Sequence, residues 1–222
     1  PQSPYTTLFR SAWRRFVMSQ SIRNIVFDFG GVLVDWNPEY LFKGVFRDQA
    51  EMDHFLDNIC NSDWNEQQDA GRPLAEAIRV LQARHPQYHH EIRMYYEEWT
   101  TTLGGPIEEN VALLEHLSAR FRLFGLSNWS AETFPIARDL YSFFDKFEGI
   151  VISGEEKLMT PDEQIYRVLL ERYGLNAGDC LFIDDSKPNV RAARGLGFQV
   201  IHLDQAANLK QHLDYMGLST PS

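Results

Sequence analysis

The sequence predicts an α/β fold, in which a doubly wound (Rossmann-like) parallel sheet forms the core and an α-helical cap is inserted into it. Two observations lead to this prediction. Over most of the 222 residues, short apolar runs typical of buried parallel strands alternate with segments of helical periodicity. Between residues 38 and 103 the alternation stops, and helical segments follow one another. This length suits one α/β domain with a small accessory domain.

The first element of the core is an apolar run that begins at Asn24 and reads NIVFDFGGVLV. Its β-favouring residues indicate a buried strand, and Gly30-Gly31 breaks the run in a tight turn. The inserted segment contains helical runs such as EYLFKGVF, MDHFLDNIC, PLAEAIRVLQARH and HEIRMYYEEW, with no convincing strand. Gly104-Gly105-Pro106 marks its end. We therefore expect the helical cap at residues 36–104 and the core at 18–35 and 105–222.

Helices and strands alternate regularly after the insertion. We expect helices at 107–120, 130–141, 161–174 and 189–197, and strands at 121–128, 149–154, 180–185 and 198–203. Pro135 marks a kink or a boundary in the second helix. Pro161 is expected in the first turn of the third helix, and Gly174 at its end. Repeated alternation of this kind implies parallel strands joined by right-handed crossovers.

Composition narrows the classes of partner. The balance of 21 Lys and Arg against 31 Asp and Glu gives a net charge of −10, which disfavours nucleic-acid binding. No apolar stretch is long enough to cross a bilayer, so we expect no membrane partner and a cytoplasmic location. Cys60 and Cys180 lie far apart and suggest neither a disulfide nor a zinc site. Residues 1–17 include PYTTLFRS, which resembles a translated sequencing adapter, so we expect a non-native leader there.

Three of the expected strands end in polar residues that could form one site. Asp28 ends the first strand, Ser127 and Asn128 end the second, and Asp184 and Asp185 end the fourth. Because the carboxyl ends of parallel strands share one edge of the sheet, these residues should converge there. Taken singly, each has an ordinary explanation, such as a turn at Asp28 or a helix N-cap at Ser127. Two adjacent carboxylates are harder to explain, since their charges repel unless a cation or hydrogen bonds hold them.

Four segments in this order resemble the motifs of the haloacid dehalogenase superfamily. They read VFDFGGVL, LSN, KLMTPDEQIY and LFIDDSKPNVRAARGLGF, and the resemblance extends from Ile22 to Leu203. The insertion after the first motif is similar to the helical cap that the superfamily carries at its first cap site. Within the superfamily, the sequence resembles bacterial phosphatases and dehalogenase-like hydrolases, including phosphatases that act on glucose 1-phosphate.

This resemblance implies a Mg²⁺-dependent phosphatase that acts on a small phosphorylated metabolite, such as a sugar phosphate. It implies that Asp28 is the nucleophile and forms an aspartyl-phosphate, which water then hydrolyses. A metal must neutralise charge between this carboxylate and the phosphate, and Mg²⁺ prefers hard oxygen ligands. The implied ligands are the carboxylates of Asp28, Asp184 and Asp185 and the backbone carbonyl of Gly30.

The phosphate-binding groups are implied in the same way. The hydroxyl of Ser127 and the backbone amides of Phe29, Gly30 and Asn128 would donate hydrogen bonds to the phosphoryl oxygens. The alternative role of Gly30 is an ordinary tight turn. Asn189 would either organise the loop after the acidic pair or cap the helix that follows.

One departure from the family pattern concerns the general acid. Family phosphatases carry an Asp two residues after the nucleophile, and here that position is Gly30. General acid catalysis contributes about 10²–10⁴-fold to the rate. A sugar 1-phosphate has a more acidic leaving hydroxyl and needs this help less, and the glucose-1-phosphate enzymes also have Gly there. A water or a cap residue could substitute, and Asp35 is a candidate, although a solvated hinge residue is the simpler reading.

A second departure concerns a cation. Thr160 stands where the family has a Lys directly before Pro-Asp. Lys157, three residues earlier, could hold Asp28 and the phosphate together from the same loop. It could equally be a solvated surface charge.

The cap contributes aromatic and histidine residues. Its aromatic side chains could stack on a sugar, although packing within the helices is favoured for most of them; they are Trp36, Trp64, Tyr95, Tyr96 and Trp99. The histidines have no supported metal-ligand spacing, and we expect them at the surface; they are His85, His89 and His90.

Two other functions remain open. A 2-haloacid dehalogenase would use Asp28 to attack carbon and expel a halide, but such enzymes need no metal and lack the paired acidic residues of the last motif. A catalytically impaired homologue that binds phosphate or a partner is suggested by Gly30 and Thr160. The sequence leaves a monomer and a homodimer equally open.

Overall fold

A computed structural model describes residues 22–204 and 208–218, so the expected leader at 1–17 lies outside the described residues. The core is a five-stranded sheet in the order β5-β4-β1-β6-β7. Its strands are β1 (Asn24–Phe27), β4 (Arg122–Ser127), β5 (Gly149–Ile152), β6 (Cys180–Asp184) and β7 (Gln199–His202). All neighbouring strands pair in parallel. The chain winds outward from the central β1 in both directions, and the prediction of a doubly wound α/β core is confirmed.

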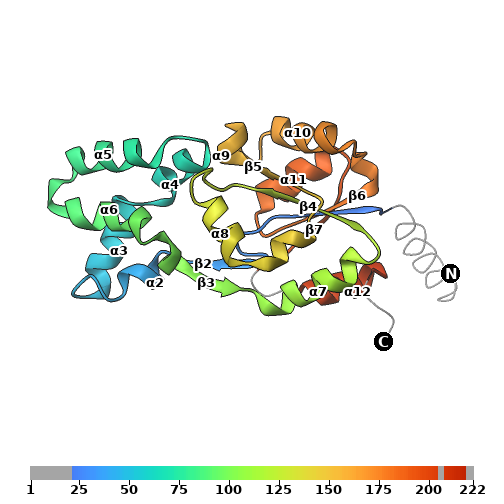
Figure 1. Ribbon diagram of the computed structural model, residues 1–222, viewed down its shortest axis with the longest axis horizontal. Coiled ribbons are helices and arrows are strands. Elements are labelled where there is room, and N and C mark those ends of the chain that lie inside the picture. Colours follow the sequence, from blue (N-terminus) through green and yellow to red (C-terminus); the bar gives the residue numbers. More distant parts are fainter. Residues whose placement is uncertain (1–21, 205–207, 219–222) are drawn as a thin grey trace, which may run out of the picture.

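Alternate side chains of β1 enter two hydrophobic layers, one on each face of the sheet. Ile25 and Phe27 pack with α7 (Glu108–Ser118) and α12 (Leu209–Met216). Val26 packs on the other face with α10 (Glu163–Tyr173) and α11 (Lys187–Gly195). Figure 1 shows these two pairs of helices on opposite sides of the sheet. Because helices cover both faces, the strands read as continuous apolar runs.

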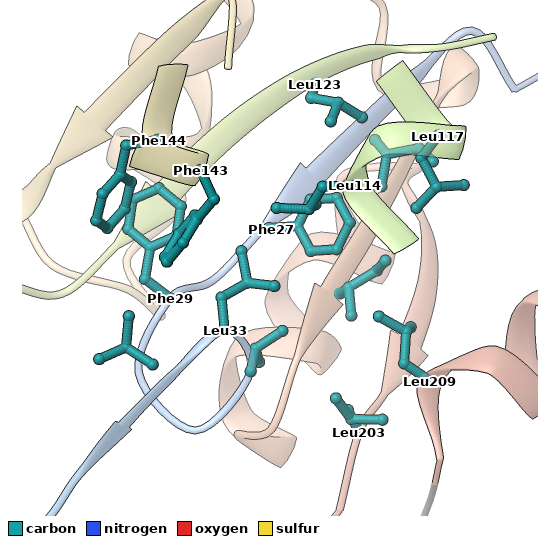
Figure 2. Close-up of a cluster of buried hydrophobic side chains, with 14 of the residues drawn as sticks. Phe27, Phe29, Leu33, Leu114, Leu117, Leu123, Phe143, Phe144, Leu203 and Leu209 are labelled. Carbon is teal, nitrogen blue, oxygen red and sulfur yellow. The ribbon is translucent and has the colours of Figure 1, made fainter. Parts of the chain in front are cut away.

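The loop after β1 is anchored in the first of these layers. Phe29 lies next to Phe143 and Phe144, while Phe27 faces Leu114 of α7 (Figure 2). The Phe29 ring meets that of Phe144 edge to face, with centroids 4.9 Å apart, a favourable arrangement of two rings. This packing fixes the backbone on either side of Asp28.

The helical insertion, residues 37–102, lies beyond one end of the sheet (blue to green in Figure 1). It contains α2 (Glu39–Phe42), α3 (Gln49–Asn58), α4 (Ser62–Asp69), α5 (Leu74–Arg84) and α6 (His89–Glu97), with short 3-10 turns η1 (Pro86–Tyr88) and η2 (Trp99–Thr102). These helices bury their own hydrophobic cluster, which is centred on Phe42, Phe55 and Tyr95. The insertion therefore has a core separate from those of the sheet.

A two-stranded antiparallel ribbon joins the insertion to the sheet. It consists of β2 (Val34–Trp36) and β3 (Leu103–Pro106). Gly104-Gly105-Pro106 follow the last helical turn of the insertion, and they also form most of β3, a strand that the sequence did not predict. Glycine and proline have weak strand propensity, so pairing with β2 rather than the local sequence makes this segment a strand. The expected cap boundaries at 36 and 104 fall within this ribbon.

Several helix boundaries also differ from expectation. The helix α10 begins at Glu163 behind the N-cap Asp162, so Pro161 precedes the helix instead of opening its first turn. Pro135 lies in the first turn of α8 (Phe134–Leu140), so it marks a boundary and not a kink. The helices α9 (Ser153–Glu156) and α12 were not expected. Among the helices that the structure describes, none has the length and apolar character needed to cross a membrane.

Candidate active site

Three carboxylates meet at the carboxyl edge of the sheet. Asp28 follows β1, Asp184 ends the neighbouring strand β6, and Asp185 comes next in the chain. Each contributes a carboxylate oxygen, and these oxygens lie within 4.8 Å of one another. Phe27 and Ile183 are register partners in the two strands, so the residues that follow them emerge side by side. In the part of the chain that the structure describes, this is the group of side chains spaced to hold a metal ion.

Ser127 approaches Asp28 from the other side of β1. It is the last residue of β4, which also pairs with β1, and its Oγ donates a hydrogen bond to Asp28 Oδ1 at 2.7 Å. The next residue, Asn128, holds the loop before α10. Its Nδ2 donates to the Thr160 carbonyl at 3.0 Å, and its Oδ1 accepts from the Thr160 amide at 2.9 Å. Hydrogen bonds thus connect the end of β4 to Asp28 through Ser127, and to the loop before α10 through Asn128.

Asp184 is held by hydrogen bonds from the start of α11. The Ser186 amide donates to Asp184 Oδ1 at 2.6 Å, and Asn189 Nδ2 lies 3.0 Å and 3.3 Å from its two oxygens. Asn189 therefore organises the acidic loop, and it is not the N-cap, because the helix begins at Lys187. Asp184 is only 1% exposed, whereas Asp185 faces solvent.

Burial raises the pKa values of all three acids. Burial, followed by the charge of Asp184, raises the pKa of Asp28 well above its ordinary value, while the Ser127 hydrogen bond opposes the shift. Burial raises the pKa of Asp184 to about 6 and also raises the pKa of Asp185. Three carboxylates this close need a cation, because their ionised forms repel one another and are poorly solvated.

A cavity of about 360 Å³ opens beside Asp28, and we call it the Asp28 cavity. Its walls include Gly30, Ser127, Thr160 and the exposed Glu66 of α4. Among the described residues that line it there is no Lys or Arg. Any positive charge that balances the acids must therefore come from a bound cation or from a side chain that moves in.

A second, smaller cavity of about 120 Å³ lies between the helical insertion and the core, and Gly30 and Asn128 line both cavities. We call it the aromatic cavity, because four of its walls are ring systems: Trp36, Tyr96, Trp99 and Trp129. Its polar walls include Asn65 and Asp69 from α4. Of the aromatic residues expected in the insertion, Trp64 and Tyr95 pack in its own hydrophobic cluster instead.

Sequence reasoning missed Asp69, Asn65 and Trp129. Trp129 directly follows Ser127-Asn128, and its position in the loop after a strand was a signal that could have been used. Asp69 carries no comparable signal. It is the last residue of α4, and its place in the wall of the cavity that Gly30 also lines depends on how the insertion packs against the core.

Several other residues singled out in the sequence line neither the Asp28 cavity nor the aromatic cavity. Lys157 is exposed, has a left-handed backbone (φ 58°) at the end of α9, and lies against Gly71. It is not among the residues that line the Asp28 cavity. Asp35 accepts a hydrogen bond from the Tyr40 hydroxyl at 2.8 Å and lines neither cavity. His89 and His90 are exposed, as expected, and His85 is half-buried.

Comparison with protein families agrees with this architecture. The family described as haloacid dehalogenase-like hydrolase matches residues 22–197, which include strands β1, β4, β5 and β6 of the sheet, the insertion and all three acids. The chain is a haloacid dehalogenase-like hydrolase. This hydrolase is 28% identical over 188 residues to a sesquiterpene phosphatase of Aspergillus oryzae, and the match covers 84% of this chain and 92% of that protein.

Comparisons of sequence and of structure also find similarity to proteins from Bacteroides thetaiotaomicron. A D-ribitol-5-phosphate phosphatase is 24% identical over 205 residues, covering 86% of this chain and 97% of that protein. A haloacid dehalogenase family enzyme, crystallised with magnesium and inorganic phosphate, superimposes with a TM-score of 0.69 at 20% identity. That superposition covers 86% of this chain and 98% of the other, so the two share one fold over nearly their whole length.

Proposed function

We propose that this hydrolase is a Mg²⁺-dependent phosphatase of small phosphorylated metabolites, with Asp28 as its nucleophile. The observation that carries the proposal is the cluster of Asp28, Asp184 and Asp185, whose carboxylate oxygens lie within 4.8 Å of one another. Ser127 donates a hydrogen bond to Asp28, and the cavity beside them is large enough for a phosphate group. Two related proteins are phosphatases, which supports the same reaction class.

The donor set fits Mg²⁺. Mg²⁺ takes hard oxygen ligands and usually keeps several waters, so a few carboxylates at the mouth of a cavity suffice. Asp28, Asp184 and Asp185 would hold the ion with the backbone carbonyl of Gly30. When bound, the ion would neutralise the charge of the carboxylates and of an incoming phosphate. The cavity walls described above offer no cationic side chain that could do this in its place.

Asp28 would attack phosphorus in line. A bond forms between its carboxylate oxygen and phosphorus, and the ester P–O bond breaks with its electron pair on the leaving oxygen. Water then attacks the aspartyl-phosphate, which releases phosphate and restores Asp28. Ser127 would orient the attacking carboxylate and donate to a phosphoryl oxygen, together with the amides of Phe29, Gly30 and Asn128. The helical insertion would act as the cap that covers the leaving group.

Hydrolysis of p-nitrophenyl phosphate tests the proposal. We expect turnover in Mg²⁺, none in EDTA, and loss of turnover in Asp28→Asn, while Asp145→Asn, an exposed acid on η3 (Ser142–Lys146), retains it. A panel of sugar 1-phosphates beside sugar 6-phosphates, with ribitol 5-phosphate, would then identify the leaving group that the cavity accepts.

Two results would replace this proposal by another function. Release of halide from 2-chloropropionate in EDTA would indicate a 2-haloacid dehalogenase, a reaction in which the three-acid cluster has no use. Thermal stabilisation by Mg²⁺ and phosphate without turnover of any ester in the panel would indicate a protein that binds phosphate but does not hydrolyse it.

A further inference from the structure

Asp69 is a half-buried residue of the helical insertion that lines the aromatic cavity. It ends α4 and lines this cavity together with Gly30 and Asn128, the two residues that also line the Asp28 cavity. Gly30 lies two residues after Asp28 and has no side chain to offer a proton. We infer that Asp69 is the general acid that protonates the leaving oxygen, a role that rests on the proposed phosphatase function.

A relay of hydrogen bonds within the insertion orients the Asp69 carboxylate. Asn65 Nδ2 donates to Asp69 Oδ2 at 2.9 Å, and Asn65 Oδ1 accepts from the Tyr96 hydroxyl at 2.9 Å. Gln68 Nε2 in turn donates to the Tyr96 oxygen at 3.0 Å. Because the Tyr96 hydroxyl occupies the Asn65 oxygen, the Asn65 amide group must turn its N–H toward Asp69.

Residues of the core also hydrogen-bond Asp69, so contacts from both the insertion and the core fix its position. The Ser130 backbone amide hydrogen-bonds the Asp69 carboxylate, and Ser130 lies two residues after Asn128. Ser153 Oγ donates to the Asp69 carbonyl at 2.5 Å and accepts from the Trp129 amide at 2.9 Å. These bonds seat the end of α4 on the loop that follows β4, which carries Asn128, and on Ser153 at the start of α9.

The surroundings of Asp69 suit a proton donor. Burial raises the pKa of Asp69 to about 7; the Ser130 amide opposes the shift, and the charge of Glu66 adds to it. The ionisable groups that interact electrostatically with it include Glu66 on the same helix and Tyr95 and Tyr96 on α6. A general acid works best when its pKa lies near the operating pH, and burial of a carboxyl group is a known way to achieve this. Glu66 itself is exposed, and Asp35 is bonded to Tyr40 away from the cavity.

The protons balance over the two half-reactions. As the ester bond breaks, the proton of the Asp69 carboxyl group moves to the leaving oxygen, and Asp69 becomes ionised. The ionised Asp69 then accepts a proton from the water that attacks the aspartyl-phosphate. Both Asp28 and Asp69 return to their starting states, and no further reagent is required.

Gly30 supplies an independent way to test this role. A Cβ added at Gly30 would meet no atom within 4 Å, and the Gly30 φ is not among the positive values of the described chain. An Asp therefore fits at residue 30 without strain, and it would place a carboxyl group at the wall that both cavities share. Gly30→Asp should consequently replace Asp69 as the proton donor.

The decisive experiment compares esters whose leaving groups differ in their need for a proton. The probes are p-nitrophenyl phosphate, whose phenolate leaves without protonation, and benzyl phosphate, whose alkoxide does not. We expect Asp69→Asn to lower kcat/KM for benzyl phosphate by about 10²–10⁴-fold and for p-nitrophenyl phosphate by less than about tenfold. Gly30→Asp in the Asp69→Asn protein should restore benzyl phosphate hydrolysis. Asp63→Asn, an exposed acid on the same helix, is the matched control and should show no such selectivity.

Three results would overturn the inference while the proposed function stands. Equal losses for both esters in Asp69→Asn would make this residue a contact that only holds the insertion in place. A selective loss in Glu66→Gln instead would assign the proton to that side chain. Wild-type protein that hydrolyses p-nitrophenyl phosphate but not benzyl phosphate would have no general acid. By contrast, p-nitrophenyl phosphate hydrolysis that is absent from the wild type, or that survives Asp28→Asn, would overturn the proposed function itself.

Discussion

The candidate site gathers three carboxylates, those of Asp28, Asp184 and Asp185. Two uncharged side chains donate hydrogen bonds to them: Ser127 to Asp28 and Asn189 to Asp184. Burial raises the pKa of both Asp28 and Asp184, so ionised carboxylates here cost folding free energy until a cation joins them. Sites that bind charged ligands commonly carry such a cost, because the residues are selected for chemistry and not for stability. The metal-free protein should therefore gain stability when one of these charges is removed.

Asp28→Asn tests this directly. Asn keeps an oxygen that accepts the Ser127 hydrogen bond but removes the charge next to Asp184, so we expect the Tm in EDTA to rise by about 2–4 °C, equivalent to about 1 kcal/mol. The same change should shrink the rise in Tm that Mg²⁺ causes in the wild type. Thermal unfolding with and without Mg²⁺ measures both effects. A lower Tm of the variant in EDTA would contradict the electrostatic account.

Asp69→Asn should change how stability depends on pH. The pKa of Asp69 is about 7 in the folded protein and near 3.8 in an unfolded chain, so the folded state binds more protons between these values. The free energy of unfolding must then fall as pH rises through this range. Asn cannot ionise, so the Tm of the variant minus that of the wild type should increase from pH 5 to pH 8. A difference that stays constant or decreases would show that the pKa of Asp69 is not raised in the folded protein.

Substitutions at Thr160 and Lys157 test whether a lysine side chain supplies positive charge to the site. Thr160 is 5% exposed and lines the Asp28 cavity, whereas Lys157 is exposed and lies against Gly71. We expect Thr160→Lys to raise kcat/KM for p-nitrophenyl phosphate by roughly tenfold, the effect of one charge-assisted hydrogen bond. Steady-state rates of Thr160→Lys and Lys157→Ala, measured side by side, check this. No gain in the first with a large loss in the second would mean that Lys157 swings in to supply the cation.

The sequence predicted the acids and Ser127 correctly as neighbours because each directly follows a strand, and parallel strands end at one edge. The same reasoning could not place Lys157 or Asp69, which are positioned by a loop and by a docked helix. Asp69 faces the site only because Ser130 and Ser153 bond the end of α4 to the core. Contacts between the insertion and the core produce no periodic pattern in the sequence.

At the scale of single elements, strand β4 carries a glycine that its packing requires. A Cβ at Gly125 would overlap the ring of Phe29, which follows Asp28 in the chain and packs against Phe144. The strand and the nucleophile loop are therefore close-packed at this point. Glycine inside a strand often marks such a close approach.

Gly125→Ala should displace the Phe29 ring and cost about 1–3 kcal/mol, the usual penalty for overpacking a core. The matched control is Gly195→Ala at the end of α11, where a Cβ would meet nothing within 4 Å. There Ala should stabilise the protein or leave it unchanged, because it has the higher helix propensity. Urea unfolding of both variants gives the comparison. Equal stability of Gly125→Ala and the wild type would show that the Phe29 ring can move aside without cost.

The elements that were predicted well are those with strong local signals. The strand β6 is a run of apolar residues, and α10 ends at Gly174 in a left-handed conformation, as a helix-stop glycine should. The strand β3 was missed because Gly104 and Gly105 carry no strand propensity and depend on β2 for pairing. Local sequence thus predicts an element whose own residues favour that structure. It fails for an element that forms only because it pairs with another segment.

At the scale of the whole molecule, the chain forms hydrophobic cores that are separate from one another. The cluster around Phe42, Phe55 and Tyr95 belongs to the insertion, while the two layers around β1 belong to the sheet. The β2-β3 ribbon and a few hydrogen bonds connect the parts, including Leu74 N to Glu132 Oε1 at 2.8 Å. An interruption in the alternation of helices and strands led us to expect an inserted cap, but nothing in the sequence indicated the hydrogen bonds that join it to the core.

Separate cores predict separate local stability. Phe55 is fully buried in the insertion and Phe182 is fully buried in the sheet, so truncating either to Ala should cost about 3–5 kcal/mol within its own core. In Phe55→Ala, amide hydrogen exchange should accelerate in α3, α5 and α6, while β1, β4 and β6 stay protected, because local opening follows the packing of each unit.

Phe182→Ala should behave differently. The connecting ribbon is a separate two-stranded sheet that follows the loop after β1, and the end of α4 is bonded to residues that follow β4 and β5. Loss of the sheet core should therefore accelerate exchange in the insertion as well. Hydrogen-exchange mass spectrometry on the two variants distinguishes these patterns. If Phe55→Ala exposed the sheet amides as strongly as those of the insertion, the molecule would unfold as one cooperative unit, and the helical insertion could not open over the acids independently of the sheet.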